Sequence, residues 1–230
     1  MMTSTFRAPF SVFDASVDIR VKQLEEDLST MLTSLVCGLH QLLDLKDLNT
    51  GVHSTRLAEW GMRLGQELGI EDHRLREIEI AAVVHDIGKI GVSESILNKP
   101  AKLTEEERIA INKHPEFGWG VLHLFPQLQE ASLITLHHHE NMDGTGYPGK
   151  LRGSEIPIGA RIVTVIDAFD AMVSNRPYRK GLPADEAKRR LILGCETQFD
   201  SSVVQCFLRI VDHELPTVFA ATGTDMNVVF

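Results

Sequence analysis

Seven side chains of this 230-residue sequence could together bind metal ions. They are five histidines and two aspartates, namely His53, His85, Asp86, His114, His138, His139 and Asp167. Imidazole and carboxylate groups without a thiolate suit iron, manganese or zinc. Because seven ligands exceed what one ion usually takes, we expect two ions that share a carboxylate. A water bridging such ions would be acidified to hydroxide near neutral pH.

Each of these features alone has an ordinary structural explanation. A buried His–Asp pair is usually just hydrogen-bonded, and the three consecutive histidines at 137–139 could form a polar helix end. His85 and Asp86, however, end an apolar stretch, where adjacent polar residues need partners because burying them unpaired is costly. Asp167 likewise places a charge inside an apolar segment. Taken together, the features favour a metal centre over isolated polar residues.

The composition excludes several other classes of protein. No run of about eighteen apolar residues is present, and residues 1–16 lack a basic region followed by an apolar stretch, so we expect neither membrane insertion nor a secretion signal. The three cysteines form no CxxC pair, which indicates a reducing compartment and predicts a cytoplasmic protein. A net charge of −9 argues against binding polymeric nucleic acid but permits a small phosphate ligand.

Hydrophobic periodicity predicts an all-α protein. Apolar residues three and four apart form a stripe at Val17, Val21, Leu24, Leu28, Met31 and Leu35. We expect this N-terminal helix to pack on the protein's own core, with a dimeric coiled coil as the alternative. Further helices are expected over residues 54–68, 74–87, 104–114, 128–140, 159–174, 183–195 and 201–215.

Several of these helices have recognisable ends. Gly69 suits a C-terminal cap, and Thr104 with Glu107 forms a capping box. Asp185 and Ser201 are N-cap candidates for the last two helices. Most of the candidate ligands therefore fall at or near helix ends.

Four motifs occur in order along the chain. HDIGK occupies residues 85–89 and HHENMDGTGYP occupies residues 138–148, with further motifs at 96–118 and 165–182. The first two resemble the HDxGK and HHExxDGxGYP signatures of the HD-GYP family, a subgroup of the HD-domain metal-dependent phosphohydrolases. The resemblance runs from Leu28 to Leu215. It implies an HD-domain helical bundle at 28–215, a partly helical N-terminal extension at 1–27 and a C-terminal tail at 216–230.

The resemblance also implies how the ligands divide. One ion would be held by His53, His85, Asp86 and Asp167, and the other by Asp86, His114, His138 and His139. His137 lies outside the ligand pair of the motif. Three-metal members of the family have a glutamate where this chain has Asn49, so we expect two divalent ions, iron first and manganese as the alternative. Met142, where many members have tryptophan, removes no ligand.

The implied activity is hydrolysis of cyclic di-GMP to linear pGpG, with GMP as a second possible product, by a metal-dependent phosphodiesterase that uses a metal-bridging hydroxide. Asp86 and Lys89 are the expected catalytic residues. Cationic side chains can pair with the phosphates of such a substrate. The expected substrate contacts are Lys89, Asp143, Tyr147, Arg176, Arg179 and Lys180.

Two other functions remain open at this point. The chain could be a catalytically weak or inactive signalling module that binds a cyclic dinucleotide and docks another signalling protein on its Gly-Tyr-Pro loop. It could instead hydrolyse another nucleotide, such as cyclic GMP-AMP or a mononucleotide. The complete ligand set, Lys89 and Arg176 favour an enzyme. A homodimer through the N-terminal helix is a further expected association.

Overall fold

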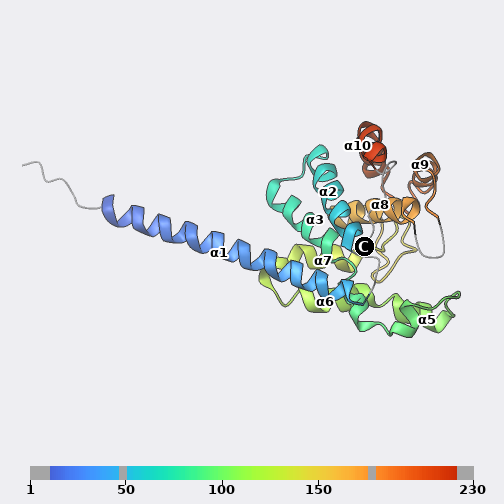
Figure 1. Cartoon of the computed structure of the whole chain (residues 1–230), viewed down its shortest axis with the longest axis horizontal. Coiled ribbons are helices and arrows are strands. Elements are labelled where there is room, and N and C mark those ends of the chain that lie inside the picture. The colour runs from blue at the N-terminus through green and yellow to red at the C-terminus, as the bar shows by residue number, and fades with distance from the viewer. Residues whose placement is uncertain (1–10, 47–50, 176–179, 222–230) are drawn as a thin grey trace, which may run out of the picture. The chain divides into compact units, whose positions relative to one another are not determined.

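The protein is built from α-helices and short 3-10 helices. The computed structural model describes residues 11–46, 51–175 and 180–221, and these residues contain no named β-strand (Figure 1). The all-α prediction is therefore confirmed. The chain divides into two units, residues 1–38 and residues 39–230. Among the described residues, every helix is too short or too polar to cross a membrane.

The first unit contains most of helix α1 (Ser11–Asp44), which is 34 residues long. Its apolar stripe is exposed, since Val17, Leu24 and Met31 are 52%, 65% and 69% accessible. We expected this stripe to pack on the protein's own core. Among the described residues of the unit, α1 is the only helix, so nothing within the unit covers the stripe.

The second unit is a bundle of helices. Its α-helices after α1 are α2 (Gly51–Glu67), α3 (Asp72–Val84), α4 (Glu94–Leu97), α5 (Glu105–Ile111), α6 (His114–Leu122), α7 (Gln129–His137), α8 (Ile158–Val173), α9 (Ala184–Leu193) and α10 (Ser201–Ala221). Its 3-10 helices are η1 (Ile87–Gly91), η2 (Pro126–Leu128) and η3 (Gly153–Glu155). Helix α2 packs on α3, α8 and α10, and α7 packs on α3, α6 and α8.

Helix α8 lies deepest in this bundle. Its residues 162–166 are all buried, which is typical of a helix that is apolar around most of its circumference. The expectation of helix rather than strand for this segment is confirmed. Because α8 is so enclosed, the charges that it carries at Asp167 and Asp170 require partners on neighbouring elements.

Two helices end earlier than the sequence predicted. The helix expected to carry His85 and Asp86 in its last turn ends at Val84, His85 is its C-cap, and η1 follows. The helix expected to reach His114 ends at Ile111, and α6 begins at His114. Pro115 explains this second break, because proline fits the first turn of a helix but disrupts an interior position.

The helix caps match the sequence in part. The capping box is confirmed, since Glu107 N donates to Thr104 Oγ1 at 3.3 Å and Thr104 N donates to Glu107 Oε2 at 2.8 Å. At α10, Asp200 rather than Ser201 accepts a hydrogen bond from a first-turn amide, that of Ser202, at 2.8 Å. The N-cap of α9 is Pro183, and Asp185 lies in the first turn instead.

Gly88 allows η1 to approach α6 closely. A Cβ atom at this position would collide with the carbonyl oxygen of His114 and with the amide nitrogen of Gly118. The glycine of the HDIGK sequence therefore brings the segment that carries His85 and Asp86 against the start of α6.

Candidate metal centre

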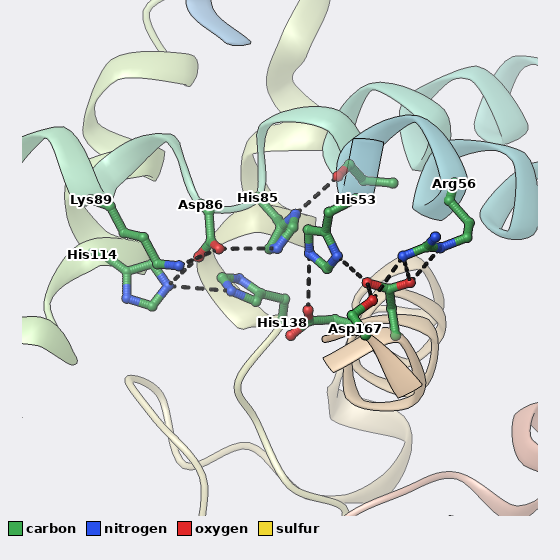
Figure 2. Close-up of polar contacts among 11 residues, drawn as sticks. His53, Arg56, His85, Asp86, Lys89, His114, His138 and Asp167 are labelled. Atoms are coloured by element: carbon green, nitrogen blue, oxygen red, sulfur yellow. Dashed lines mark hydrogen bonds and ion pairs between the residues drawn. The ribbon is translucent and has the colours of Figure 1, made fainter. Parts of the chain in front are cut away.

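Two groups of histidines and aspartates in the second unit bring together atoms that could hold metal ions (Figure 2). The first group is His53, His85 and Asp167, and the second is Asp86, His114, His138 and His139. Within each group, one ligand atom from every residue lies within 4.8 Å of the others. These are the seven side chains that the sequence singled out.

Five parts of the fold supply these side chains. His53 lies in the first turn of α2, and Asp167 lies in α8. His85 and Asp86 connect α3 to η1, and His114 is the first residue of α6. His138 and His139 directly follow α7. The site therefore depends on the packing of α2, α3, α6, α7 and α8 around one point.

Asp86 lies between the two groups. Its Oδ2 is 3.4 Å from His85 Nε2, and its Oδ1 is 3.2 Å from His114 Nε2, so each carboxylate oxygen faces a different group. Lys89 Nζ donates to Oδ2 at 2.6 Å. Burial alone would raise the pKa of Asp86, but Lys89 and the neighbouring histidines outweigh it and hold the pKa well below its usual range. Asp86 is therefore an anion that can face both groups.

Three of the imidazoles are oriented by the main chain. His85 Nδ1 lies 2.9 Å from the carbonyl oxygen of Ala82, His114 Nδ1 lies 2.8 Å from that of Ile111, and His138 Nδ1 lies 2.6 Å from that of Thr135. A carbonyl oxygen only accepts, so each Nδ1 must donate the proton. In the neutral ring this leaves Nε2 with a lone pair directed into the site.

The resulting arrangement fits metal ions better than hydrogen bonding alone. His85 Nε2 is buried, and its 3.4 Å contact with Asp86 Oδ2 is an ion-pair contact without a hydrogen bond. His114 Nε2 and His138 Nε2 face each other at 3.4 Å, although the Nδ1 atom of each ring already carries its proton. Burial and the adjacent imidazoles lower the pKa of His138 well below its usual range and that of His139 to about 4, so both rings stay neutral. Converging lone pairs of this kind need a cation between them.

His53 is oriented by a side chain instead. Its Nδ1 lies 2.5 Å from Asp170 Oδ2, and its Nε2 lies 3.4 Å from Asp167 Oδ1. Burial lowers the pKa of His53, but hydrogen bonds to the two carboxylates raise it to about 9. Asp170 is fully buried and also contacts the guanidinium of Arg56. Asp170 lies in the same apolar segment as Asp167, but the sequence pattern predicted no role for it.

Glu140 holds the loop that follows the histidine run. Its buried carboxylate accepts hydrogen bonds from Gly149 N at 2.6 Å and from Leu151 N at 3.1 Å. His137 Nδ1 lies 3.4 Å from the same carboxylate, and His137 belongs to neither ligand group. Glu140 therefore fixes the Gly-Tyr-Pro loop beside the site, a role that was not inferred from the sequence.

The predicted substrate contacts differ in how near they lie to the two ligand groups. The Tyr147 ring is 5.0 Å from the His139 ring, centroid to centroid, so this side chain lies at the edge of the second group. Asp143 Oδ1 accepts hydrogen bonds from the amide and hydroxyl of Thr145 at 2.9 and 2.6 Å, within the loop. Lys180 is exposed and belongs to neither ligand group. Asn49, Arg176 and Arg179 lie outside the described residues.

The residues that were not predicted from the sequence contact partners that are distant along the chain. Asp170 meets His53 across 117 positions, and Arg56 meets Asp170 across 114. The available signal was a second acid three residues after Asp167, which a helix places near the same face. No comparable signal identified its partner.

Comparisons with known proteins identify the family to which the chain is similar. Residues 38–203 match the family described as HD domain. The chain is 39% identical over 183 residues to a cyclic di-GMP phosphodiesterase of Thermotoga maritima, covering 79% of this chain and 50% of that protein. It is 38% identical over 203 residues to the cyclic di-GMP phosphodiesterase response regulator RpfG of Xanthomonas campestris, covering 84% and 54%. The chain thus spans about half the length of these relatives.

The fold has similar solved structures. A cyclic GMP-AMP specific phosphodiesterase of Vibrio cholerae matches with a TM-score of 0.58 at 18% identity, over 83% of this chain and 50% of that one. An HD domain implies binding of divalent metal ions, and the His–Asp groups provide suitable ligands. On the family match and the two relatives, this chain belongs to the HD-domain family, in its HD-GYP subgroup.

Proposed function

We propose that the chain is a metal-dependent phosphodiesterase that hydrolyses cyclic di-GMP to linear pGpG, with GMP as a further product. The observation that carries the proposal is the position of Asp86 between the two ligand groups, with one oxygen toward each. The two relatives named cyclic di-GMP phosphodiesterases support the choice of substrate, because each match covers most of this chain.

The ligand sets follow from the two groups. His53, His85, Asp86 and Asp167 would hold one ion, and Asp86, His114, His138 and His139 would hold the other. When bound, two divalent ions would polarise the phosphoryl oxygens. They would also lower the pKa of a coordinated water, so that hydroxide is available near neutral pH to attack phosphorus. The chain itself supplies preorganised lone pairs, since the imidazoles are fixed by hydrogen bonds before any ligand arrives.

Lys89 would act beside Asp86 on the substrate phosphate. An ammonium carries three N–H donors, so its 2.6 Å contact with Asp86 is compatible with a second contact to a phosphoryl oxygen. Tyr147, next to His139, would line the substrate, and Asp143 would act by shaping the loop. Arg176, Arg179 and Lys180 remain proposed partners of the phosphates because cationic side chains pair with the phosphate oxygens of a dianionic substrate.

We propose iron as the resident metal, with manganese as the alternative. The set of five imidazoles and two carboxylates, without thiolates, is of the kind that these ions accept. Metal analysis of protein purified without oxygen would identify the ion directly.

Product analysis on metal-defined protein tests the activity. Protein loaded with iron or manganese is incubated with cyclic di-GMP, and the products are separated by chromatography. We expect pGpG, and expect none from Asp86→Asn. The control is Asp200→Asn, because Asp200 is also buried and paired with an arginine but belongs to neither ligand group.

Two outcomes would contradict hydrolysis of cyclic di-GMP and favour another function. Cleavage of cyclic GMP-AMP with none of cyclic di-GMP would reassign the substrate, in line with the Vibrio cholerae structure. Binding of cyclic di-GMP without any product, by metal-loaded protein, would favour a signalling module that docks another protein on the Gly-Tyr-Pro loop.

We further propose that the chain forms a homodimer through α1. The exposed stripe places Val21, Leu28 and Leu35 at one core position of a heptad, called a, and the remaining stripe residues at the other, called d. In this register Arg20 is at position g and Glu25 at position e of the next heptad. In a parallel, in-register pair of α1 helices, position g of one helix faces position e of the other, so the two charges are complementary.

Exchanging these two charges tests the dimer. Arg20→Glu or Glu25→Arg alone would weaken association by about 1 kcal/mol, roughly fivefold in Kd, and the double exchange would restore it. Sedimentation at several concentrations measures the change. A monomer throughout the micromolar range, or single and double variants that behave alike, would contradict the parallel dimer.

A further inference from the structure

Asp170 is, among the residues that the structure describes, the carboxylate in contact with the imidazole of His53 on the side away from the ligand group. It lies one turn after Asp167 on α8 and is fully buried. Its Oδ2 lies 2.5 Å from His53 Nδ1, while His53 Nε2 faces Asp167 at 3.4 Å. The two aspartates therefore contact the two nitrogens of a single ring.

We propose that Asp170 is a positioning residue, which fixes the tautomer and the ring orientation of His53 so that Nε2 is presented as a metal ligand. A carboxylate that accepts the Nδ1 proton leaves the lone pair on Nε2 and makes it more basic. The inference rests on the proposed metal centre, because it concerns how one of its ligands is prepared.

His53 is oriented differently from three of the other ligands. His85, His114 and His138 each donate to the carbonyl three residues earlier. His53 is the third residue of α2. Its Nδ1 is instead directed across the bundle to α8.

The surroundings of Asp170 hold its carboxylate in place. Arg56 donates from its guanidinium to Asp170, and Arg56 Nη2 donates to Ser174 Oγ at 2.9 Å. Ser174 Oγ in turn donates to Asp170 Oδ2 at 3.1 Å. The Arg56 guanidinium also lies 5.7 Å from the centre of the Trp60 ring. A buried charge with this many donors is compensated, and it fixes the spacing between α2 and α8.

Asp170→Asn tests the proposal, because the amide has nearly the same shape but no negative charge. We expect the ion held by the group of His53 to bind 10–100-fold more weakly, on the order seen for partners of ligating histidines. The ion held by the second group should keep its affinity. Chelator competition with metal analysis measures both. Histidine ¹⁵N spectra of the metal-free protein, recorded well above pH 9 where the His53 ring is neutral, provide a second readout. The parent is expected to have its single His53 proton on Nδ1, and the variant a mixture of tautomers.

Asp200→Asn is the matched control. Asp200 is buried and ion-paired with Arg161 Nη1 at 2.9 Å, but it contacts none of the seven ligands through any described interaction. We expect this variant to keep both ions. If Asp170→Asn fails to fold, Ser174→Ala removes one donor to the same carboxylate, and a weaker effect of the same kind is expected.

Two results would overturn the proposal. One is parent-like affinity for both ions and an unchanged His53 tautomer in Asp170→Asn or, where that variant is unfolded, in Ser174→Ala. The other is equal loss of metal from Asp170→Asn and Asp200→Asn, which would indicate general destabilisation. Because both readouts are independent of turnover, absence of cyclic di-GMP hydrolysis would count against the proposed function and leave the role of Asp170 intact.

Discussion

One imidazole distinguishes the two ligand groups, because His53 is held by a side chain whereas His85, in the same group, donates to the main chain. His114 and His138, in the second group, donate their Nδ1 protons to carbonyls three residues earlier, so the local chain fixes them. His53, in the first group, donates to Asp170, 117 positions away. The second group should therefore form once α3, α6 and α7 have packed together, whereas the first group also depends on correct packing of α2 against α8.

Asp86 joins the two groups, and its removal should have the largest effect. In Asp86→Ala we expect loss of both ions and a fall in phosphodiesterase activity of about 10³-fold or more, since metal ions supply several kcal/mol of transition-state stabilisation. Metal analysis and product assays measure the two effects. Retention of two ions by this variant would show that the groups are independent of the carboxylate.

The second group can be removed selectively. His138→Ala or His139→Ala should lose one ion while the first group keeps the other, because neither histidine belongs to the first group. His137→Ala should keep both ions, since His137 contacts Glu140 instead. Equal metal loss in all three variants would mean that the histidine run acts as one polar segment.

Lys89 separates metal binding from chemistry. Lys89→Met should retain both ions but lose about 100-fold in kcat, in the range found when one electrostatic donor to a transition state is removed. Metal content together with steady-state kinetics distinguishes the cases. Loss of metal in parallel with activity would assign Lys89 to holding Asp86 alone.

The smallest expected effect is a difference in pH dependence of the metal-free fold. The pKa of His139 is lowered to about 4 by burial, so the unfolded state binds more protons between about pH 4 and 6.5, and stability falls as the pH drops through this window. The pKa of His53 is raised to about 9, so its contribution is complete below pH 6.5 and is lost as the pH rises toward 9.

Urea unfolding in the presence of a chelator measures these opposite signs. His139→Gln should flatten the acid side of the stability profile, and His53→Gln should flatten the alkaline side. Profiles that keep the parent's shape in both variants would remove this contrast between the groups.

The sequence led to the all-α fold and to the seven side chains because both depend on local patterns. Helical periodicity and adjacent polar residues in apolar segments are visible in a single sequence. The break before Pro115 and the roles of Asp170 and Glu140 were not predicted. The break follows from a local signal, the proline itself, whereas the roles of Asp170 and Glu140 depend on which distant segments pack together.

Anomalous diffraction from crystals of the metal-loaded protein tests the central claim most directly. Data collected at the absorption edge of the loaded metal should show two peaks flanking the Asp86 carboxylate. One peak should lie beside Nε2 of His53 and His85, and the other beside Nε2 of His114 and His138. A single peak, or two peaks that do not share Asp86, would contradict a centre joined by this carboxylate.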